Sequence, residues 1–264
     1  MIKNKRIYTV NSRSRISGTD EDFLFKIDLP KGEKFDRVAL LDASIPKSYY
    51  LVQSGRNTFT LTETAGSATV TITPGNYSRK EFRTVLESKL TAASTGLSGW
   101  TYTVTIPSAP DTGKFTYAAA GGAGAQPAIV VTTYLFEQLG FSQNTTNTFV
   151  AGSLTSTNVV KFQAEDNLFI HSDIVGGGQD DTLQHIQAGS TVDYGTINYE
   201  CREVDSNSRQ LGSAENNVFR FSLTDEDKVT MSLNGLNMVF TLVIYRRDPV
   251  FDLIKHAIRF MIAQ

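Results

Sequence analysis

The stretch Asp22-Phe-Leu-Phe-Lys-Ile-Asp-Leu29 decides the fold class, because it places two phenylalanines and an isoleucine on one face of an extended chain. A period of two is typical of a β-strand that buries one face. A second, more continuously apolar run follows at 37–44 and stops at Pro46, because proline has no N–H to donate to a sheet. The sequence therefore predicts two early β-strands.

The same β-strand pattern returns after residue 154, in apolar runs separated by turns rich in glycine, serine and asparagine. These runs lie at 167–174, 182–187, 191–201, 217–223, 229–233 and 238–245. Together with 6–10 and the two early strands, they amount to about eight or nine strands, which suits two packed antiparallel sheets. We therefore expect an all-β fold, an antiparallel β-sandwich of jelly-roll type. An immunoglobulin-like sandwich is the alternative, because the number of strands does not separate the two architectures.

Residues 56–154 differ from the β regions on either side and predict a small inserted α+β module. Two alternating threonine-rich runs, 57–62 and 68–73, flank a turn at Gly66 and predict a hairpin with one apolar face. A chain of 264 residues with 40% apolar side chains is long enough to bury the core of such a composite domain.

A helix is predicted directly after the hairpin. Ser78 and Glu81 have the spacing of a capping box, and Tyr77 can pack on Phe82 as a hydrophobic staple. Apolar residues then recur at helical spacing, namely Phe82, Val85, Leu86 and Leu90. The inserted module is therefore expected to contain one helix packed on its strands.

Both ends of the chain differ from the β body, which is expected at 22–55 plus 155–248. Residues 1–21 begin with five cations and no acid among the first fifteen positions, and predict a basic N-terminal arm. Residues 249–264 follow a proline with apolar side chains on one side, and predict a C-terminal amphipathic helix. Residues expected to make contacts from these ends are Lys3, Lys5, Arg6, Arg13, Arg15, Phe251, Ile254, Ile258 and Met261.

No catalytic or metal-binding motif is found in the sequence. The single cysteine, Cys201, excludes an internal disulfide framework, and the three histidines lack metal-site spacing. His171 and Asp173 share one face of a predicted strand, so a ligand pair is conceivable, with a polar sheet face as the simpler explanation. The acidic clusters at 20–22, 180–181 and 225–227 are expected to be solvated turns, with weak calcium binding as the alternative. We therefore expect no catalytic residue, no metal and no cofactor.

Charge and hydropathy limit the partners of the folded body. A formal charge of −2 gives no overall positive field toward nucleic acid or anionic lipid, so such contacts must be local to the basic arm. No run of about 18 apolar residues predicts a membrane span, and no signal peptide is recognised, so a soluble, unprocessed chain is expected.

Six short segments occur in a fixed order along the chain. They are Tyr8-Thr-Val-Asn-Ser-Arg13 with Asp22-Phe23, Ala43-Ser-Ile-Pro-Lys-Ser-Tyr-Tyr50, Asn57-Thr-Phe59, Pro74-Gly-Asn-Tyr-Ser78, Leu139-Gly-Phe141 and Leu233-Asn-Gly235. In this order they resemble the single jelly-roll penton or minor capsid proteins of virophages, polinton-like viruses and related large double-stranded DNA viruses. The resemblance spans nearly the whole chain.

The resemblance implies a structural capsid protein of the virion, made in the host cell cytoplasm, and not an enzyme. It implies a homo-oligomer, a pentamer at the icosahedral vertices, beside a neighbouring major capsid protein. The termini would contact an inner membrane, the genome or a neighbouring subunit, unless the basic arm is solvated and the C-terminal helix packs on its own sandwich. The insertion would contact a host receptor. The alternatives are a lectin-like carbohydrate-binding jelly-roll module or a spike-base protein, with a hydrolase third. Trp100 is the only tryptophan, which weakens a sugar-stacking platform.

Overall fold

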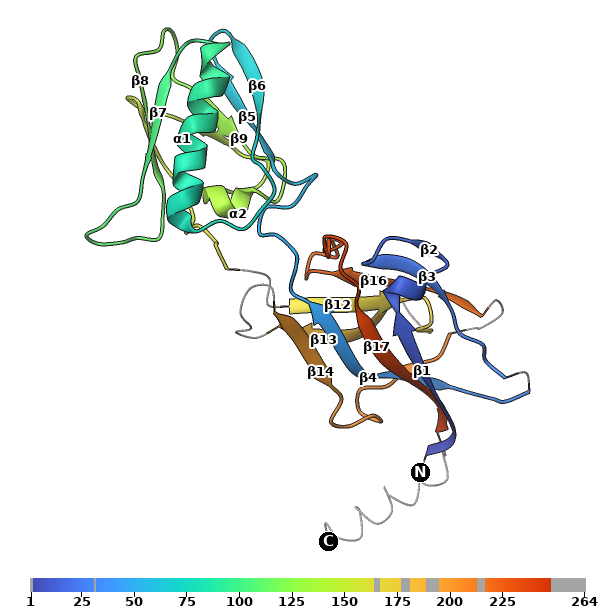
Figure 1. The fold of residues 1–264 in the computed structure, drawn as a ribbon. Helices are drawn as coiled ribbons and strands as arrows, with labels where there is room; N and C mark the ends of the chain where they lie inside the picture. Colours follow the sequence, from blue (N-terminus) through green and yellow to red (C-terminus); the bar gives the residue numbers. More distant parts are fainter. Residues whose placement is uncertain are drawn as a thin grey trace. The chain divides into compact units, whose positions relative to one another are not determined.

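The computed structural model describes residues 2–30, 32–163, 167–176, 181–188, 195–212 and 217–247, with side chains from residue 4 onward. The chain divides into two compact units (Figure 1). The first combines Met1–Tyr49 with Glu165–Gln264, and the second is Tyr50–Ala164. The helix expected at 249–264, with Phe251, Ile254, Ile258 and Met261, lies outside the described residues.

The first unit is a β-sandwich made of two antiparallel sheets. One sheet has the order β1-β17-β4-β14, with β15 also paired to β4, and the other has the order β13-β12-β16-β3-β2 (Figure 1). The strands are β1 (Ile2–Asn11), β2 (Ser17–Gly18), β3 (Asp22–Lys26), β4 (Arg37–Pro46), β12 (Asn167–Ser172), β13 (Thr182–Gln187), β14 (Thr196–Glu200), β15 (Arg209–Gln210), β16 (Val218–Thr224) and β17 (Val239–Arg247). A 3₁₀ turn, η1 (Ser12–Ser14), follows β1.

The strand order is that of a jelly roll. When the two-residue strands β2 and β15 are left aside, eight strands remain, and in chain order the sheets read 1-8-3-6 and 5-4-7-2. The first strand pairs with the last, as in a jelly roll, whereas an immunoglobulin sandwich places its first and last strands differently. The predicted all-β jelly-roll sandwich is confirmed, and the immunoglobulin-like alternative is wrong.

Aromatic side chains join the two sheets. Phe221 of β16 packs edge-on against Phe240 of β17 in the opposite sheet, with ring centroids 5.2 Å apart. Phe23, from the stretch that predicted the fold, lies 5.9 Å from Phe221. All three rings are buried, so the alternation at 22–29 does mark a face turned into the sandwich.

Two stretches of the first unit differ from the sequence expectations. The strand predicted at 6–10 is present as β1 but begins earlier, at Ile2, and it pairs with β17 on both sides of an irregularity between Lys3 and Arg6. The strand predicted at 229–233 is wrong, because in this stretch only Thr230 forms an isolated bridge, to Thr224. Met231 and Leu233 are nevertheless buried, so the alternation there reflects an extended segment that covers the core without joining a ladder.

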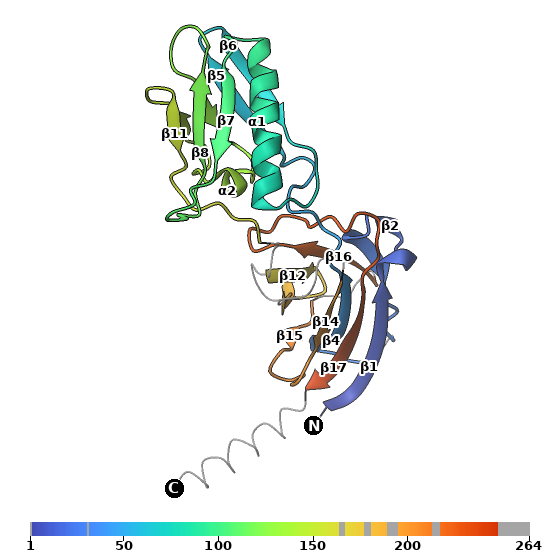
Figure 2. The same ribbon diagram turned by 60° about the vertical axis from the view of Figure 1, so that its left-hand side comes forward.

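The second unit surrounds its own hydrophobic core with two small sheets and a helix. Its sheets have the orders β10-β9-β5-β6 and β11-β8-β7, and Figure 2 shows α1 lying lengthwise beside β7 and β6. Its elements are β5 (Thr58–Glu63), β6 (Gly66–Thr71), α1 (Arg79–Thr95), β7 (Thr101–Thr105), β8 (Thr116–Ala120), β9 (Ala128–Val130), α2 (Phe136–Leu139), β10 (Thr146–Thr148) and β11 (Ser153–Thr155). In the described parts of the chain, no helix has the length and apolarity needed to cross a bilayer.

The start of α1 agrees with its sequence prediction. The Ser78 hydroxyl accepts from the Glu81 N–H at 3.2 Å, and the Glu81 carboxylate accepts from the Ser78 N–H at 2.9 Å. The hydrogen bonds from Ser78 lower the pKa of Glu81 below its ordinary value. The rings of Tyr77 and Phe82 pack edge-on at 5.7 Å. The predicted capping box and staple are both confirmed.

A buried carboxylate in the second unit was not expected from the sequence. Glu63 ends β5 and is 5% exposed. Its Oε1 accepts from the Tyr102 hydroxyl, and its Oε2 accepts from the Ser98 N–H, both at 2.8 Å. Burial, reinforced by the nearby carboxylate, raises the pKa of Tyr102 far above its ordinary value, so this hydroxyl stays a donor. Glu63 therefore joins the β5–β6 turn to the loop after α1.

We expect Glu63→Gln to lower the free energy of unfolding of the second unit by about 1–3 kcal/mol, because the amide can accept only one of the two donors that now share the carboxylate. Urea denaturation followed by Trp100 fluorescence measures this loss, since Trp100 belongs to the same unit. Lys89→Gln is the matched control, because Lys89 is an exposed charged residue of the same unit. Equal midpoints for the two variants would show that the buried contacts of Glu63 contribute nothing.

Candidate functional site

The pairing of β1 with β17 brings the first and last described residues to the same end of the sandwich. Ile2 lies opposite Arg247 and Lys3 opposite Arg246 in the register of the two strands. Figure 1 shows the N-terminus beside the end of β17. The start of the basic stretch therefore lies beside Arg247, the last described residue of β17.

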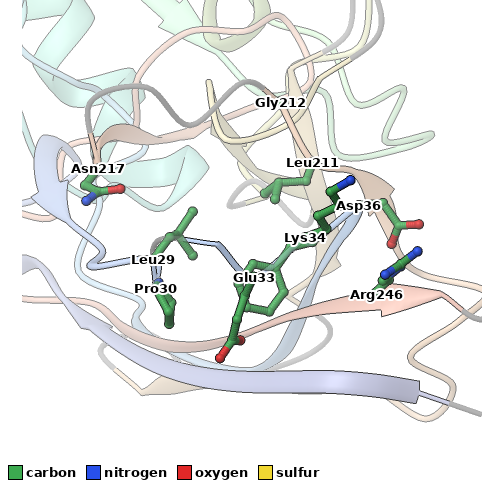
Figure 3. A pocket seen from close by; sticks show the side chains of 10 residues that line it. Leu29, Pro30, Glu33, Lys34, Asp36, Leu211, Gly212, Asn217 and Arg246 are labelled. Atoms are coloured by element: carbon green, nitrogen blue, oxygen red, sulfur yellow. The ribbon is translucent and has the colours of Figure 1, made fainter.

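A cleft of about 630 Å³ lies at this end of the sandwich, where Arg246 near the end of β17 forms part of its wall (Figure 3). It is formed by the loop between β3 and β4, by the residues after β15, by Asn217 before β16 and by Arg246. Its apolar lining residues are Leu29, Pro30, Phe35 and Leu211. Its charged lining residues are Glu33, Lys34, Asp36 and Arg246. Its volume is in the range of sites that bind a few side chains or a small ligand.

Asp36 holds the walls of the cleft together. Its N–H donates to the carbonyl oxygen of Tyr245 at 3.2 Å, and its own carbonyl oxygen accepts from the Leu211 N–H at 2.9 Å. Its carboxylate accepts from the Arg247 N–H at 2.9 Å. One residue thus joins the β3–β4 loop to β17 and to the segment after β15, so the cleft is a built feature of the fold.

The basic strand β1 contacts the same loop. The Arg6 guanidinium donates to both carboxylate oxygens of Glu33, at 2.5 and 3.3 Å, and these hydrogen bonds raise the pKa of Arg6. The Tyr8 hydroxyl donates to the carbonyl oxygen of Asp28 at 2.9 Å. Arg6, predicted as an outside contact, is therefore engaged by its own chain beside the cleft.

The other predicted basic residues do not form one cluster. Arg15 donates to Asp20 at 2.7 Å and to two backbone carbonyl oxygens near η1. Lys5 and Arg13 are exposed, but they lie toward opposite ends of β1. The side chain of Lys3 is outside the described residues. Exposed cations that remain for an outside partner are therefore divided between the two ends of this strand.

His171 has a different carboxylate partner from the one that the sequence suggested. Its Nδ1 lies 2.9 Å from Asp181 of the segment before β13, and its Nε2 lies 2.9 Å from the Thr224 hydroxyl. Asp173 instead accepts the Arg220 N–H at 2.9 Å. The pair of His171 with Asp173, the alternative to a polar sheet face, does not form, because β12 ends at Ser172 and Asp173 lies beyond the strand alternation. Within the described residues, no group of three or more His, Cys, Asp or Glu could hold a metal ion.

The sequence patterns did not predict the cleft. Its walls come from four places in the chain, between Leu29 and Arg246, so no local pattern shows that they meet. The only available signal was the unusual concentration of charge with Phe35 in the stretch Lys31-Gly-Glu-Lys-Phe-Asp36.

Comparisons with known proteins find similar solved structures. No protein-family model matches the chain, and no curated protein sequence matches it. The crystal structure of the selenomethionine-labelled mavirus penton protein is similar to this chain with a TM-score of 0.45 and 11% sequence identity. The superposition covers 92% of this chain and 99% of that protein.

Proposed function

We propose that this chain is a structural capsid protein, the penton subunit that assembles as a pentamer at the vertices of an icosahedral shell. The observation that carries the proposal is the order of the two sheets of the first unit, with β1 beside β17 and β3 beside β16. Double-sheet jelly rolls of this kind occur in viral capsids, lectins and cupins. Because a fold alone does not fix a function, the six ordered sequence segments favour the capsid among these classes.

The inserted unit and the sandwich can carry different functions within the subunit. Tyr50–Ala164 enters between β4 and β12 and buries its own core, so its surface can vary without changing the sandwich. Loops and insertions carried by a rigid scaffold commonly hold binding functions. We assign host attachment to this unit and shell formation to the sandwich.

The buried position of Trp100 does not favour the carbohydrate-binding alternative. Trp100 is 8% exposed, and a Cβ placed on Gly122 would come within 2.2 Å of its ring. A stacking platform for a sugar needs an aromatic face open to solvent, and the only tryptophan of the chain does not offer one.

Mass photometry of the full chain across salt and protein concentration tests the proposal. Subunits that meet head to tail close into a ring when the rotation between them is one fifth of a turn. We expect a discrete species at five times the 29.0 kDa mass of one chain. A chain that stays monomeric at every concentration, alone and mixed with its major capsid protein, would contradict the penton assignment.

A further inference from the structure

We infer that the cleft beside Arg246 binds the C-terminal segment, residues 249–264, of the same chain. The inference goes beyond the proposed function, because it requires neither a pentamer nor a virus particle. It rests on where the described chain ends, on the chemistry of the cleft and on the pattern of the residues that follow.

The segment starts at the cleft. The last described residue, Arg247, is next to Arg246, which lines the cleft. Pro249 cannot extend the ladder of β17, because it has no N–H to donate, and it suits the first turn of a helix. Phe251 is only four residues beyond Arg247, a span of at most about 14 Å even when fully extended. Phe251, the first aromatic residue after Pro249, therefore lies within reach of the cleft.

The apolar pattern of the segment matches the lining of the cleft. Phe251, Ile254 and Ile258 recur at the spacing with which an amphipathic helix places its anchors into a groove. The cleft offers apolar side chains from two separate parts of the fold, Leu29 and Leu211 among them. Burial of such side chains against each other supplies the driving force for docking.

The charges of the two partners are also complementary. The rim of the cleft carries both signs, with Lys34 and Arg246 as cations and Glu33 and Asp36 as acids. The polar side of the segment carries both signs too, with Asp252 followed by Lys255 and Arg259. A peptide with a single sign of charge would meet like charges on this rim, whereas a mixed one can pair with it.

A short tether favours the chain's own segment over the segment of a second copy. Joining a binding segment to its site by a few residues gives an effective concentration in the millimolar range. The segment of a neighbouring subunit is present only at the concentration of free protein, which is much lower than this effective concentration. Docking within one chain is therefore the expected state of the isolated subunit.

Hydrogen–deuterium exchange with mass spectrometry tests the inference on the full chain, at a dilution where mass photometry detects only single chains. Deleting residues 249–264 should make the amides of 29–36 and 209–212 exchange about tenfold faster, because the docked segment no longer restrains these walls. The double variant Phe251→Ser with Ile254→Ser should reproduce the effect in a chain of full length. Peptides from Tyr50–Ala164 serve as the internal reference, since that unit has its own core.

The matched control is His256→Ser with Gln264→Ser, which changes the same number of residues in the segment, but neither an apolar anchor nor a charge that faces the rim, and should leave the protection in place. Equal exchange in the full chain and in the Phe251/Ile254 variant would overturn the inference. So would protection that appears only when multimers form, because the occupant is then a second copy. A chain that shows cleft protection but no pentamer at any concentration keeps this inference and removes the proposed function.

Discussion

Phe221→Ala is expected to shift the urea midpoint of the sandwich downward by on the order of 2 M while leaving the inserted unit unchanged. Phe221 is fully buried and contacts Phe240 of the opposite sheet and Phe23 of the neighbouring strand. Removing a buried ring costs about 3–5 kcal/mol in lost burial and cavity formation, a large part of the stability of an ordinary domain.

Two optical probes separate the units in this experiment. Trp100 is the only tryptophan and lies in the core of the inserted unit, so its fluorescence follows that unit alone. Far-ultraviolet circular dichroism follows both units. Phe169→Ala is the matched control, because Phe169 is half-buried and stacks on His185 at 4.7 Å outside the inter-sheet contact. Similar shifts for the two variants would mean that Phe221 does not join the sheets.

The inserted unit, Tyr50–Ala164 expressed alone, is expected to fold as a monomer with a cooperative urea transition. Its two sheets and α1 share one buried cluster, in which residues of the β5–β6 hairpin such as Phe59 and Leu61 meet Leu86 and Leu90 of the helix. Domains of this size with their own core usually fold without the rest of the chain. Blue-shifted Trp100 emission equal to that of the full chain is the readout.

A pair of substitutions on α1 makes this result specific. Leu86→Asp should unfold the isolated unit, because it places an unpaired charge where the side chain has no exposure. Ser88→Asp, two residues away and exposed, should leave the transition in place. An isolated unit that is unfolded while the full chain is folded would show that the insertion depends on the sandwich.

Local patterns in the sequence predicted local structure well. The capping box of Ser78 with Glu81 and the hairpin around Gly66 both depend on contacts between residues a few positions apart, and the structure contains them as expected. The run at 229–233 shows the limit of such patterns. Alternate burial of Met231 and Leu233 gives the period of a strand although no ladder forms, because the segment lies extended over the core.

Features that depend on distant pairing were beyond the sequence. The count of strands suited two architectures, and only the pairing of β1 with β17, across the whole chain, separates them. The carboxylate partner of His171 is Asp181, just before β13, and not Asp173, which is closer in sequence. The cleft combines Leu29, Leu211 and Arg246, so its existence required the fold to be known.

Electron microscopy of the purified full chain tests the central claim most directly, because it images the assembly that the proposed function requires. We expect two-dimensional class averages of a closed ring with five-fold symmetry, in which every subunit contributes a sandwich and a separate inserted body. A ring of another order, or isolated subunits in the presence of the major capsid protein, would contradict the account.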